Sequence, residues 1–253
     1  LLQNAEDANT EDDEAIEVRF ILEEDRVAFE HDGSRLFSMP DVDSITSIGV
    51  STKRDDKTAI GKFGVGFKAV FSYTESPEIH SGDFHFKIAD LVVSETIKPI
   101  SRAQGDKGTT FILPFNNIKK PPEIARSEVE ASLRELGENT LLFLNHIRKI
   151  EYLLPDGSLG YLERKEKSDN RIEILVKQPE IDGEPLPSNY LRFQKTVKVK
   201  DEDGELKDCR IAIAFKLAKH ENPDTSNLPT WKIVPLARGQ VSIYFPAEKQ
   251  TSN

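Results

Sequence analysis

The stretch AIGKFGVGFKAVF, residues 59–71, places Gly61, Gly64 and Gly66 within six positions and then continues into an apolar run typical of a helix. Glycine tolerates positive φ and leaves room for a close neighbour, so one interpretation is a tight turn before a helix. In a second interpretation the turn binds a ligand, because a glycine-rich loop entering a helix presents unpaired N–H groups and the positive end of the helix dipole to phosphate. The stretch alone leaves both open.

Two other phosphate-binding motifs fit this stretch poorly. A Walker loop reads GxxxxGK[ST], but Phe63 follows Gly61-Lys62 where Ser or Thr is required, and Asp56 occupies the upstream glycine position. A dinucleotide-binding fingerprint fits residues 64–69 formally. That motif follows a buried apolar strand, whereas TKRDDKTAIGK is polar, so we reject it as well.

Composition limits the classes of protein to which the chain can belong. Its 253 residues favour two domains. The sequence is 37% hydrophobic and 31% charged, and it has no apolar run near the roughly 18 residues needed to cross a bilayer, so we expect no membrane insertion. With 34 Lys and Arg against 44 Asp and Glu, the net charge of −10 argues against a large nucleic-acid-binding surface, although a small basic groove stays compatible with it.

The single cysteine, Cys209, rules out an internal disulfide and a cysteine-rich zinc site. It favours a reducing, cytoplasmic setting. Cys209 alternates with Ile211, Ile213 and Phe215 in a strand pattern, so we predict a buried thiol.

Helix and strand patterns change character near residue 148. Before that point, helical patterns alternate with strand patterns over 16–22, 27–29, 84–88, 91–97 and 109–115. The helical patterns cover 1–9, 38–48, 67–71 and 123–137, and a further apolar run covers 141–147. After it, a turn at 155–158 is followed by strand patterns at 171–177, 190–199, 208–217 and 239–245. We therefore predict an α/β (α+β) domain over 1–148 and a β-rich domain over 149–253.

Oxygen-bearing side chains near the start of the chain suit a bound phosphate and its counterion. Asn4 and Asp7 are three residues apart on a helical segment, so they lie on one face. Mg²⁺ takes oxygen ligands and usually keeps several waters. Asp32 ends a strand just before Gly33, where it could accept a hydrogen bond from the exocyclic amine of adenine.

Four segments resemble, in order, the nucleotide-binding motifs of the GHKL superfamily of ATPases: LLQNAEDA (1–8), HDG (31–33), IGKFGVGF (60–67) and GT (108–109). That superfamily groups the heat-shock protein 90 chaperones, MutL, type II topoisomerase ATPase subunits, MORC proteins and histidine kinases. The first and third segments look closest to the heat-shock protein 90-like and sacsin-like modules. The resemblance covers residues 1–113 and implies a Bergerat fold, in which helices cover one face of a mixed sheet. In several of these families a β-rich transducer or middle domain follows.

By position, the resemblance implies ATP with Mg²⁺ as the ligand. It assigns Mg²⁺ coordination to Asn4, places Asp7 and Ala8 beside it, and assigns the adenine contact to Asp32 and Gly33 with support from Thr109. The backbone amides of one segment would wrap the phosphates: Gly61, Lys62, Phe63, Gly64, Val65, Gly66 and Phe67. Lys53, in the polar stretch 49–62, resembles a lid lysine, with a solvated loop cation as the equal alternative.

The sequence departs from the family pattern in two places. The second motif usually reads DxGxG, but His31-Asp32-Gly33-Ser34-Arg35 lacks the second glycine. Alignment on Gly33 puts His31 at the aspartate position, whereas alignment on the following helix favours Asp32, which we adopt. In hydrolysing members a glutamate general base precedes the residues that match Leu1-Leu2, and this sequence begins after that position. We therefore name no catalytic residue.

The expected function is Mg-ATP binding with slow hydrolysis in the intact chain. Such hydrolysis would drive a lid at 49–62 and neighbouring domains between states, as in a chaperone or a conformational switch. The alternative is an interaction module that binds the nucleotide without hydrolysing it. The expected partners are ATP or ADP, a protein client or neighbouring domains of a longer chain, and a second copy in an ATP-dependent homodimer.

Overall fold

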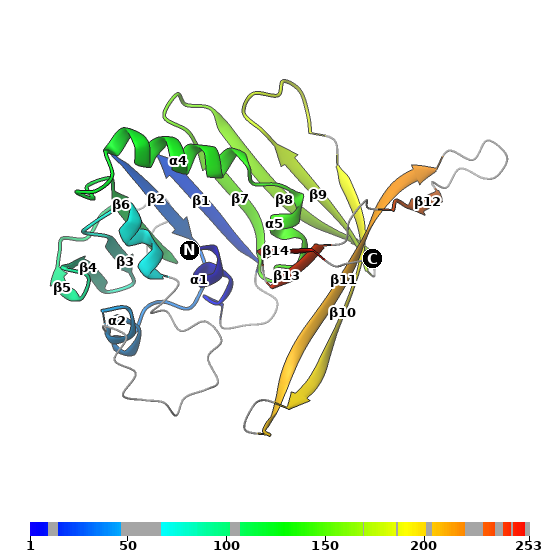
Figure 1. The fold of residues 1–253 in the computed structure, drawn as a ribbon, viewed down its shortest axis with the longest axis horizontal. Helices are drawn as coiled ribbons and strands as arrows, with labels where there is room; N and C mark the ends of the chain where they lie inside the picture. The colour runs from blue at the N-terminus through cyan, green and yellow to red at the C-terminus, as the bar shows by residue number, and fades with distance from the viewer. Residues whose placement is uncertain are drawn as a thin grey trace. The chain divides into compact units, whose positions relative to one another are not determined.

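The computed structural model describes residues 1–9, 15–46, 67–101, 107–168, 170–185, 187–200, 204–220, 230–235, 240–243 and 245–250. The chain forms two compact units. Unit 1 comprises Leu1–Leu136, Asn145–Tyr161 and Gln178–Asp182, and unit 2 comprises Gly137–Leu144, Leu162–Lys177 and Gly183–Asn253. Strands predominate, with a few helices, which confirms the predicted α+β class (Figure 1). The boundary near residue 148 stays a prediction.

Unit 1 contains a mixed sheet in the order β7-β1-β2-β6-β3-β4-β5. The pairing of β1 with β7 is parallel, and the other pairs in this order are antiparallel. The strands are β1 (Ile16–Leu22), β2 (Arg26–His31), β3 (Glu78–Ser81), β4 (Phe84–Ala89), β5 (Val93–Thr96), β6 (Thr109–Pro114) and β7 (Ile147–Leu153). The predicted hairpin over 16–29 is therefore present as β1 and β2.

Among the described residues, the helices of unit 1 are α1 (Leu2–Glu6), α2 (Met39–Thr46), the short 3₁₀ helix η1 (Lys68–Ser72) and α4 (Pro122–Arg134). The start of α2 confirms the predicted helix start, because the Ser38 hydroxyl and backbone N–H both donate to Asp41 Oδ2, at 2.6 and 2.8 Å. Helix α4 packs on β1 and β2, which Figure 1 shows in green across the blue strands. It buries Ala125 and Leu133 on its inner face.

The core of unit 1 follows the two-residue period of its strands. Val18 and Leu22 of β1, Phe29 of β2, and Phe111 of β6 are all buried. The Phe29 and Phe111 rings lie 5.9 Å apart between centroids, and Phe29 also lies 4.9 Å from Phe20. This aromatic row crosses β1, β2 and β6, two residues along each of β2 and β6 from the pair His31 and Thr109.

Strand β3 was not predicted from sequence. It has four residues, Glu78 to Ser81, two of which are polar side chains that are nevertheless fully buried, His80 and Ser81. Its position between β6 and β4 explains that burial. A short strand of mixed polarity has too little alternation to be recognised without its neighbours.

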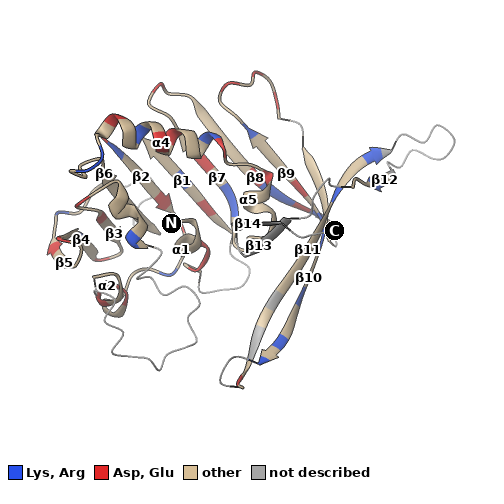
Figure 2. Cartoon of the chain, in the orientation of Figure 1, with Lys and Arg blue, Asp and Glu red and all other residues tan. Residues whose placement is uncertain are grey.

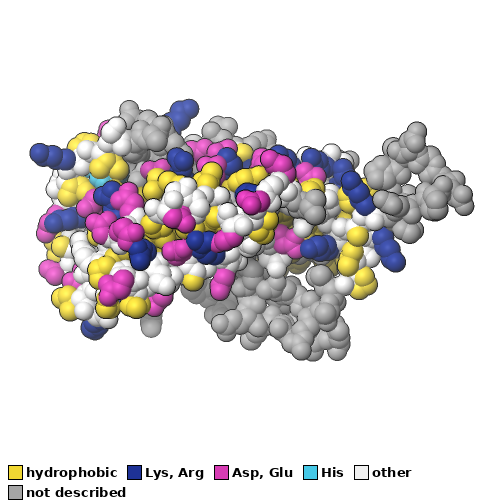
Figure 3. All heavy atoms as spheres, turned by 90° about the horizontal axis from the view of Figure 1, so that it is seen from above, with side chains coloured by type: hydrophobic (Ala, Val, Ile, Leu, Met, Phe, Trp, Pro, Cys, Tyr) yellow, Lys and Arg dark blue, Asp and Glu magenta, His cyan; other side chains and the backbone are white. Residues whose placement is uncertain are grey.

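The outer surface of unit 1 carries charges of both signs. Figure 2 shows acidic and basic residues mixed along its strands and along α4. In the view of Figure 3 both kinds are interspersed with hydrophobic side chains. Ion pairs such as Lys87–Glu95 at 2.9 Å and Arg134–Glu130 at 2.7 Å contribute to this pattern. None of the described helices is both long enough and apolar enough to cross a bilayer.

Unit 2 contains β9 (Arg171–Lys177), β10 (Ser188–Lys200), β11 (Leu206–His220) and β12 (Thr230–Ile233), in the order β12-β11-β10-β9. The chain passes from unit 1 into unit 2 within β8 (Leu159–Ser168). A separate hairpin pairs β13 (Gln240–Ile243) with β14 (Phe245–Gln250). The predicted strands over 171–177, 190–199 and 208–217 are therefore present.

Two arginines hold the short helix α5 (Glu138–Leu142) of unit 2. Arg164 Nη1 donates to the Leu141 carbonyl at 2.7 Å and also to the Leu144 carbonyl. Arg192 Nη1 donates to the Leu142 carbonyl at 3.2 Å. These cations satisfy carbonyl groups at the C-terminal end of the helix, where positive charge is stabilising.

The outer part of the β10–β11 hairpin, residues 193–200 paired with 206–213, is here called the ribbon. Strand β9 pairs only with Ser188 to Leu191 of β10, and β12 pairs only with Leu217 to His220 of β11. The ribbon thus has two strands in the part of the chain that the structure describes. Cys209 is exposed on it, so the predicted burial of this thiol is wrong. The alternation that predicted burial is real, but a two-stranded ribbon has no core of its own.

Candidate functional site

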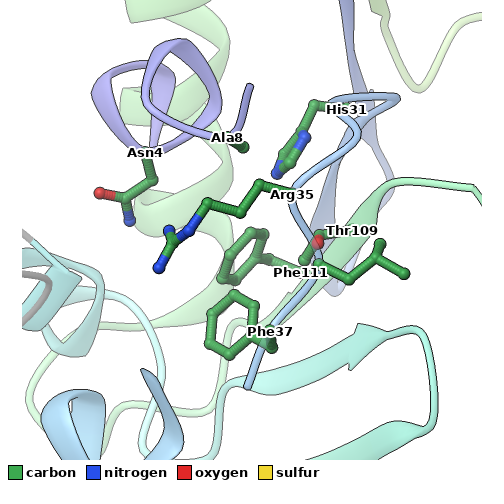
Figure 4. A pocket seen from close by; sticks show the side chains of 8 residues that line it. Asn4, Ala8, His31, Arg35, Phe37, Thr109 and Phe111 are labelled. Atoms are coloured by element: carbon green, nitrogen blue, oxygen red, sulfur yellow. The ribbon is translucent and has the colours of Figure 1, made fainter. Parts of the chain in front are cut away.

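A pocket lies in unit 1 between α1, the segment after β2 and the sheet (Figure 4), and the space inside it is about 10 Å³, enough for a single water molecule. Eight residues line it: Asn4, Ala8, His31, Arg35, Leu36, Phe37, Thr109 and Phe111. They come from α1 and the residue positions just after it, from the end of β2 and the segment that follows, and from β6. Small-molecule pockets usually measure about 300–1,000 Å³. The space that the described residues enclose is far below that range.

Strand register places three polar side chains in one row at the base of this pocket. His31 of β2 is opposite Thr109 of β6, and Thr109 is opposite Ser81 of β3. The Thr109 and Ser81 hydroxyl oxygens are 2.6 Å apart. Ser81 Oγ also accepts the Phe37 N–H at 2.9 Å. These bonds fix the wall between β6 and the segment after β2.

Two glycines let the motif segments approach closely. A Cβ on Gly33 would lie 2.4 Å from the Ala8 carbonyl oxygen, and a Cβ on Gly108, whose φ is +71°, would lie 1.8 Å from the His31 carbonyl oxygen. Arg35 N–H donates to the Ala8 carbonyl at 3.0 Å. Gly33, predicted as an adenine contact, thus has a packing role that follows from its position.

Asn4 and Ala8 form the α1 side of the pocket, and their predicted contacts with Mg²⁺ and nucleotide stay predictions. The amide of Asn4 projects toward the pocket (Figure 4), and its Nδ2 is buried with no hydrogen-bond partner among the described residues. A buried polar group without a partner costs free energy and suggests a missing ligand or water. Rotation of the amide by 180° would present the oxygen instead.

His31 is the polar residue at the end of β2 that lines the pocket. Its side chain is buried, and its Nδ1 accepts the Gly33 N–H at 3.2 Å. Burial lowers the pKa of His31 from 6.5 to about 4, so the ring is neutral at pH 7. A backbone N–H can only donate, hence the single ring proton resides on Nε2.

Asp32, which we predicted as the adenine contact, has a different environment. Its Oδ1 accepts the Glu17 N–H at 2.8 Å, and its own N–H donates to the Glu17 carbonyl at 3.3 Å. Asp32 therefore extends the β1–β2 ladder and is not among the lining residues. The choice between His31 and Asp32 stays open to experiment, and the geometry favours His31.

The two acidic residues at the end of α1 also lie outside the pocket lining. Asp7 is exposed at the C-terminal end of the helix. Glu6 is buried, and its carboxylate accepts the backbone N–H groups of Asn145, His146 and Ile147. Glu6 thus joins α1 to the start of β7, a structural role that the sequence did not reveal because its partners are about 140 residues away.

Phe67, the last residue of the predicted phosphate-binding segment, is a core residue. It is buried, and its ring centroid lies 5.8 Å from that of Phe111 and 6.4 Å from that of Phe71. The other predicted members of this segment and the lid lysine lie outside the described residues: Lys53, Gly61, Lys62, Phe63, Gly64, Val65 and Gly66. Their assignments stay predictions.

Four lining residues were not predicted: Arg35, Leu36, Phe37 and Phe111. Phe111 could have been found, because it lies two residues after Thr109 and so shares its face of the strand. Arg35 occupies the position of the missing second glycine, and its Nη2 donates to Asp41 Oδ1 at 2.7 Å. The lining therefore contains one cation, whose charge is paired with Asp41, and no carboxylate.

Metal binding by the protein alone has no support in the described part of the chain. There, no group of three or more His, Cys, Asp or Glu side chains is arranged to hold a metal ion. A Mg²⁺ ion carried by a nucleotide is a separate case, since it needs only one or two protein ligands in addition to phosphate and water.

Together, a mixed sheet, a few helices packed on it and a pocket beside the first helix define an α+β module. Residues 1–107 match the family model of the Sacsin domain. This segment includes all the predicted site residues except Thr109.

The chain is homologous to two curated proteins. It is 27% identical over 238 residues to Protein NO VEIN of Arabidopsis thaliana, which covers 86% of this chain and 8% of that protein. It is 35% identical over 99 residues to human sacsin, which covers 33% of this chain and 2% of sacsin. The chain thus spans less than a tenth of the length of either relative. A solved structure of the N-terminal domain of a DNA repair protein matches with a TM-score of 0.43 and 11% identity, over 76% of this chain and 63% of that one.

Proposed function

We propose that unit 1 binds the magnesium complex of a purine nucleoside triphosphate, with ATP as the reference ligand. The observation that carries this proposal is the convergence of three of the four ordered motifs on one pocket. The pocket is lined by Asn4 and Ala8 from the first motif, His31 from the second and Thr109 from the fourth. These residues are up to 105 positions apart in sequence. The Sacsin domain match over residues 1–107 supports the same reading of these motifs.

The chemistry of the lining suits such a ligand. Phe37, Phe111 and Ala8 offer apolar contacts to a base, whereas Arg35 offers positive charge to phosphate. The unpartnered amide of Asn4 can turn its oxygen toward Mg²⁺. When bound, Mg²⁺ would neutralise phosphate charge and orient the chain of phosphates.

Hydrolysis forms the second part of the proposal. In a longer protein, cleavage of the γ-phosphate would release a segment closed over the nucleotide and so move neighbouring domains or a protein client, as in a chaperone-like machine. Among the described lining residues, none is a carboxylate, and the lone pair of His31 is already used by Gly33. The described lining thus offers no general base to activate water. This favours the second candidate, a module that binds the nucleotide without hydrolysing it.

Binding is tested by calorimetric titration of Mg-ATP into the 253-residue chain. We expect saturable binding that is lost in Gly64→Ala and that weakens at least tenfold without Mg²⁺. In Asn4→Ala the Mg²⁺ dependence should shrink, whereas Asn139→Ala, which alters an exposed asparagine of α5, should match the wild type. Absence of ATP binding by the folded wild type would overturn the proposal.

Turnover is a separate measurement. Phosphate release at saturating Mg-ATP would support an ATPase, and normal binding without release would favour the nucleotide-gated module. Adding a glutamate before Leu1 provides a direct comparison, because the family resemblance places the general base at that position.

A further inference from the structure

His31 offers a hydrogen-bond donor to the pocket, whereas a site that binds an amino group needs a hydrogen-bond acceptor. Nδ1 of His31 is occupied by the Gly33 N–H, so Nε2 carries the proton and is a donor. In Figure 4 the far end of the His31 ring points toward the Arg35 side chain, which also lines the pocket. Nε2 is at that end of the ring, so the donor is directed into the pocket.

The nearby carboxylates have other partners. Asp32 accepts the Glu17 N–H, and Glu6 accepts three backbone N–H groups at the start of β7. Asp41 accepts hydrogen bonds from Arg35 and from Ser38. The described pocket wall therefore presents the His31 N–H and the Arg35 guanidinium, with no carboxylate to accept a hydrogen bond from a ligand amine.

We propose that His31 reads the purine base by donating from Nε2, so that 6-oxo purine triphosphates bind this pocket at least as tightly as ATP. This inference rests on the proposed nucleotide function. Adenine carries a donor amine at C6, whereas hypoxanthine and guanine carry an acceptor oxygen there. A donor that faces another donor leaves both unsatisfied in a buried site, and a donor that faces a carbonyl forms a hydrogen bond.

The neutral state of the ring supports this assignment independently. Burial holds the pKa of His31 at about 4, so at pH 7 the imidazole has one proton and one lone pair. Gly33, whose backbone lies against Ala8, fixes which nitrogen has the lone pair. The packing between α1 and the end of β2 therefore keeps the proton of the His31 ring on Nε2.

The test is competition at pH 7.5 between labelled Mg-ATP and unlabelled ATP, ITP or GTP for the wild-type chain. ITP is the sharpest probe, since it replaces the C6 amine by oxygen with no other substituent. We expect ITP to compete as well as ATP or up to about tenfold better. His31→Asp replaces the donor with an acceptor and should shift the preference toward ATP by tenfold or more, while His85→Asp, outside the lining, should leave the ratio unchanged.

The outcomes separate this inference from the proposed function. Tight ATP binding with ITP at least tenfold weaker would overturn the inference and leave the nucleotide function intact. Failure of all three nucleotides to bind would overturn the nucleotide function itself. If His31→Asp does not fold, ¹⁵N NMR of the wild-type imidazole decides the structural premise, because a proton on Nδ1 instead of Nε2 would contradict it.

Discussion

The core strands of unit 1 and the ribbon of unit 2 have the same alternating apolar pattern with opposite results. In β2, Phe29 is fully buried beneath the helical layer, whereas Phe193 in β10 is 42% exposed. Ile211 and Ile213 in β11 are also exposed. Alternation states which side chains share a face of a strand. Whether that face is covered depends on elements elsewhere in the chain, such as α4 over β1 and β2.

The two regions also differ in how their polar groups are used. In unit 1, polar side chains such as Ser81, Thr109 and Glu6 are buried and hydrogen-bonded to distant segments. They position the pocket. The ribbon has regular pairing from Phe193↔Ile213 to Lys200↔Leu206, and several of its large apolar side chains are exposed: Phe193, Val199, Leu206, Ile211 and Ile213. Substitutions should therefore be costly in the first region and mild in the second.

The largest effect is expected at Gly108, where a Cβ would meet backbone atoms of His31 and Asp32. Gly108→Val should destabilise unit 1 by about 4–5 kcal/mol, since the clash adds to the strain of a positive φ. Hydrogen exchange of unit 1 amides measures this loss. Gly157→Ala is the matched control, because φ is +84° and nothing lies within 4 Å of its Cβ, so only about 1–2 kcal/mol should be lost.

The second-largest loss of stability is expected when a phenylalanine is truncated, and it can be compared between unit 1 and the ribbon. Phe29→Ala should cost about 3–5 kcal/mol of unfolding free energy because it leaves a cavity beside Phe20 and Phe111. Phe193→Ala should cost less than about 1 kcal/mol. If hydrogen exchange shows equal losses of unfolding free energy for the two variants, the face of the ribbon that carries Phe193 is covered in solution.

A pH effect of about 3 kcal/mol is expected from His31. Its pKa is about 4 in the folded chain and 6.5 when unfolded, so the unfolded state gains the proton first as the pH falls. Stability is fully present above pH 6.5, declines as the pH falls through 4, and levels off below it. Denaturant unfolding from pH 7 to 3.5 should show this slope in the wild type and a smaller one in His31→Gln. If the unfolding free energy falls equally with pH in the wild type and in His31→Gln, His31 is not the source of the pH dependence.

The smallest effect is expected at Cys209. Cys209→Ser should change the unfolding free energy by less than about 0.5 kcal/mol, because the thiol is exposed. A thiol reagent should label the native chain nearly as fast as the unfolded chain. The chain has one cysteine, so the rate reports this position alone. Labelling that requires unfolding would restore the original prediction of a buried thiol.

Most of the secondary structure was predictable because local periodicity marks it. The hairpin of β1 and β2, helix α2 with its Ser38 cap, helix α4 and strand β9 all follow from spacing and turn residues. Strand β3 was missed because four residues with two buried polar side chains carry no such signal. Within the pocket, the motifs predicted Asn4, Ala8 and Thr109. They did not predict Arg35, which replaces a glycine.

The sequence by itself determined the order of the motifs and the two-residue and helical periods. Only the tertiary structure decided that His31 lines the pocket while Asp32 accepts a hydrogen bond from β1. It also decided that Glu6 accepts hydrogen bonds from the start of β7 and that Cys209 is exposed. The reason is physical. Backbone geometry sets a periodicity within a few residues, whereas burial and the partner of a polar group depend on segments that folding brings from far along the chain.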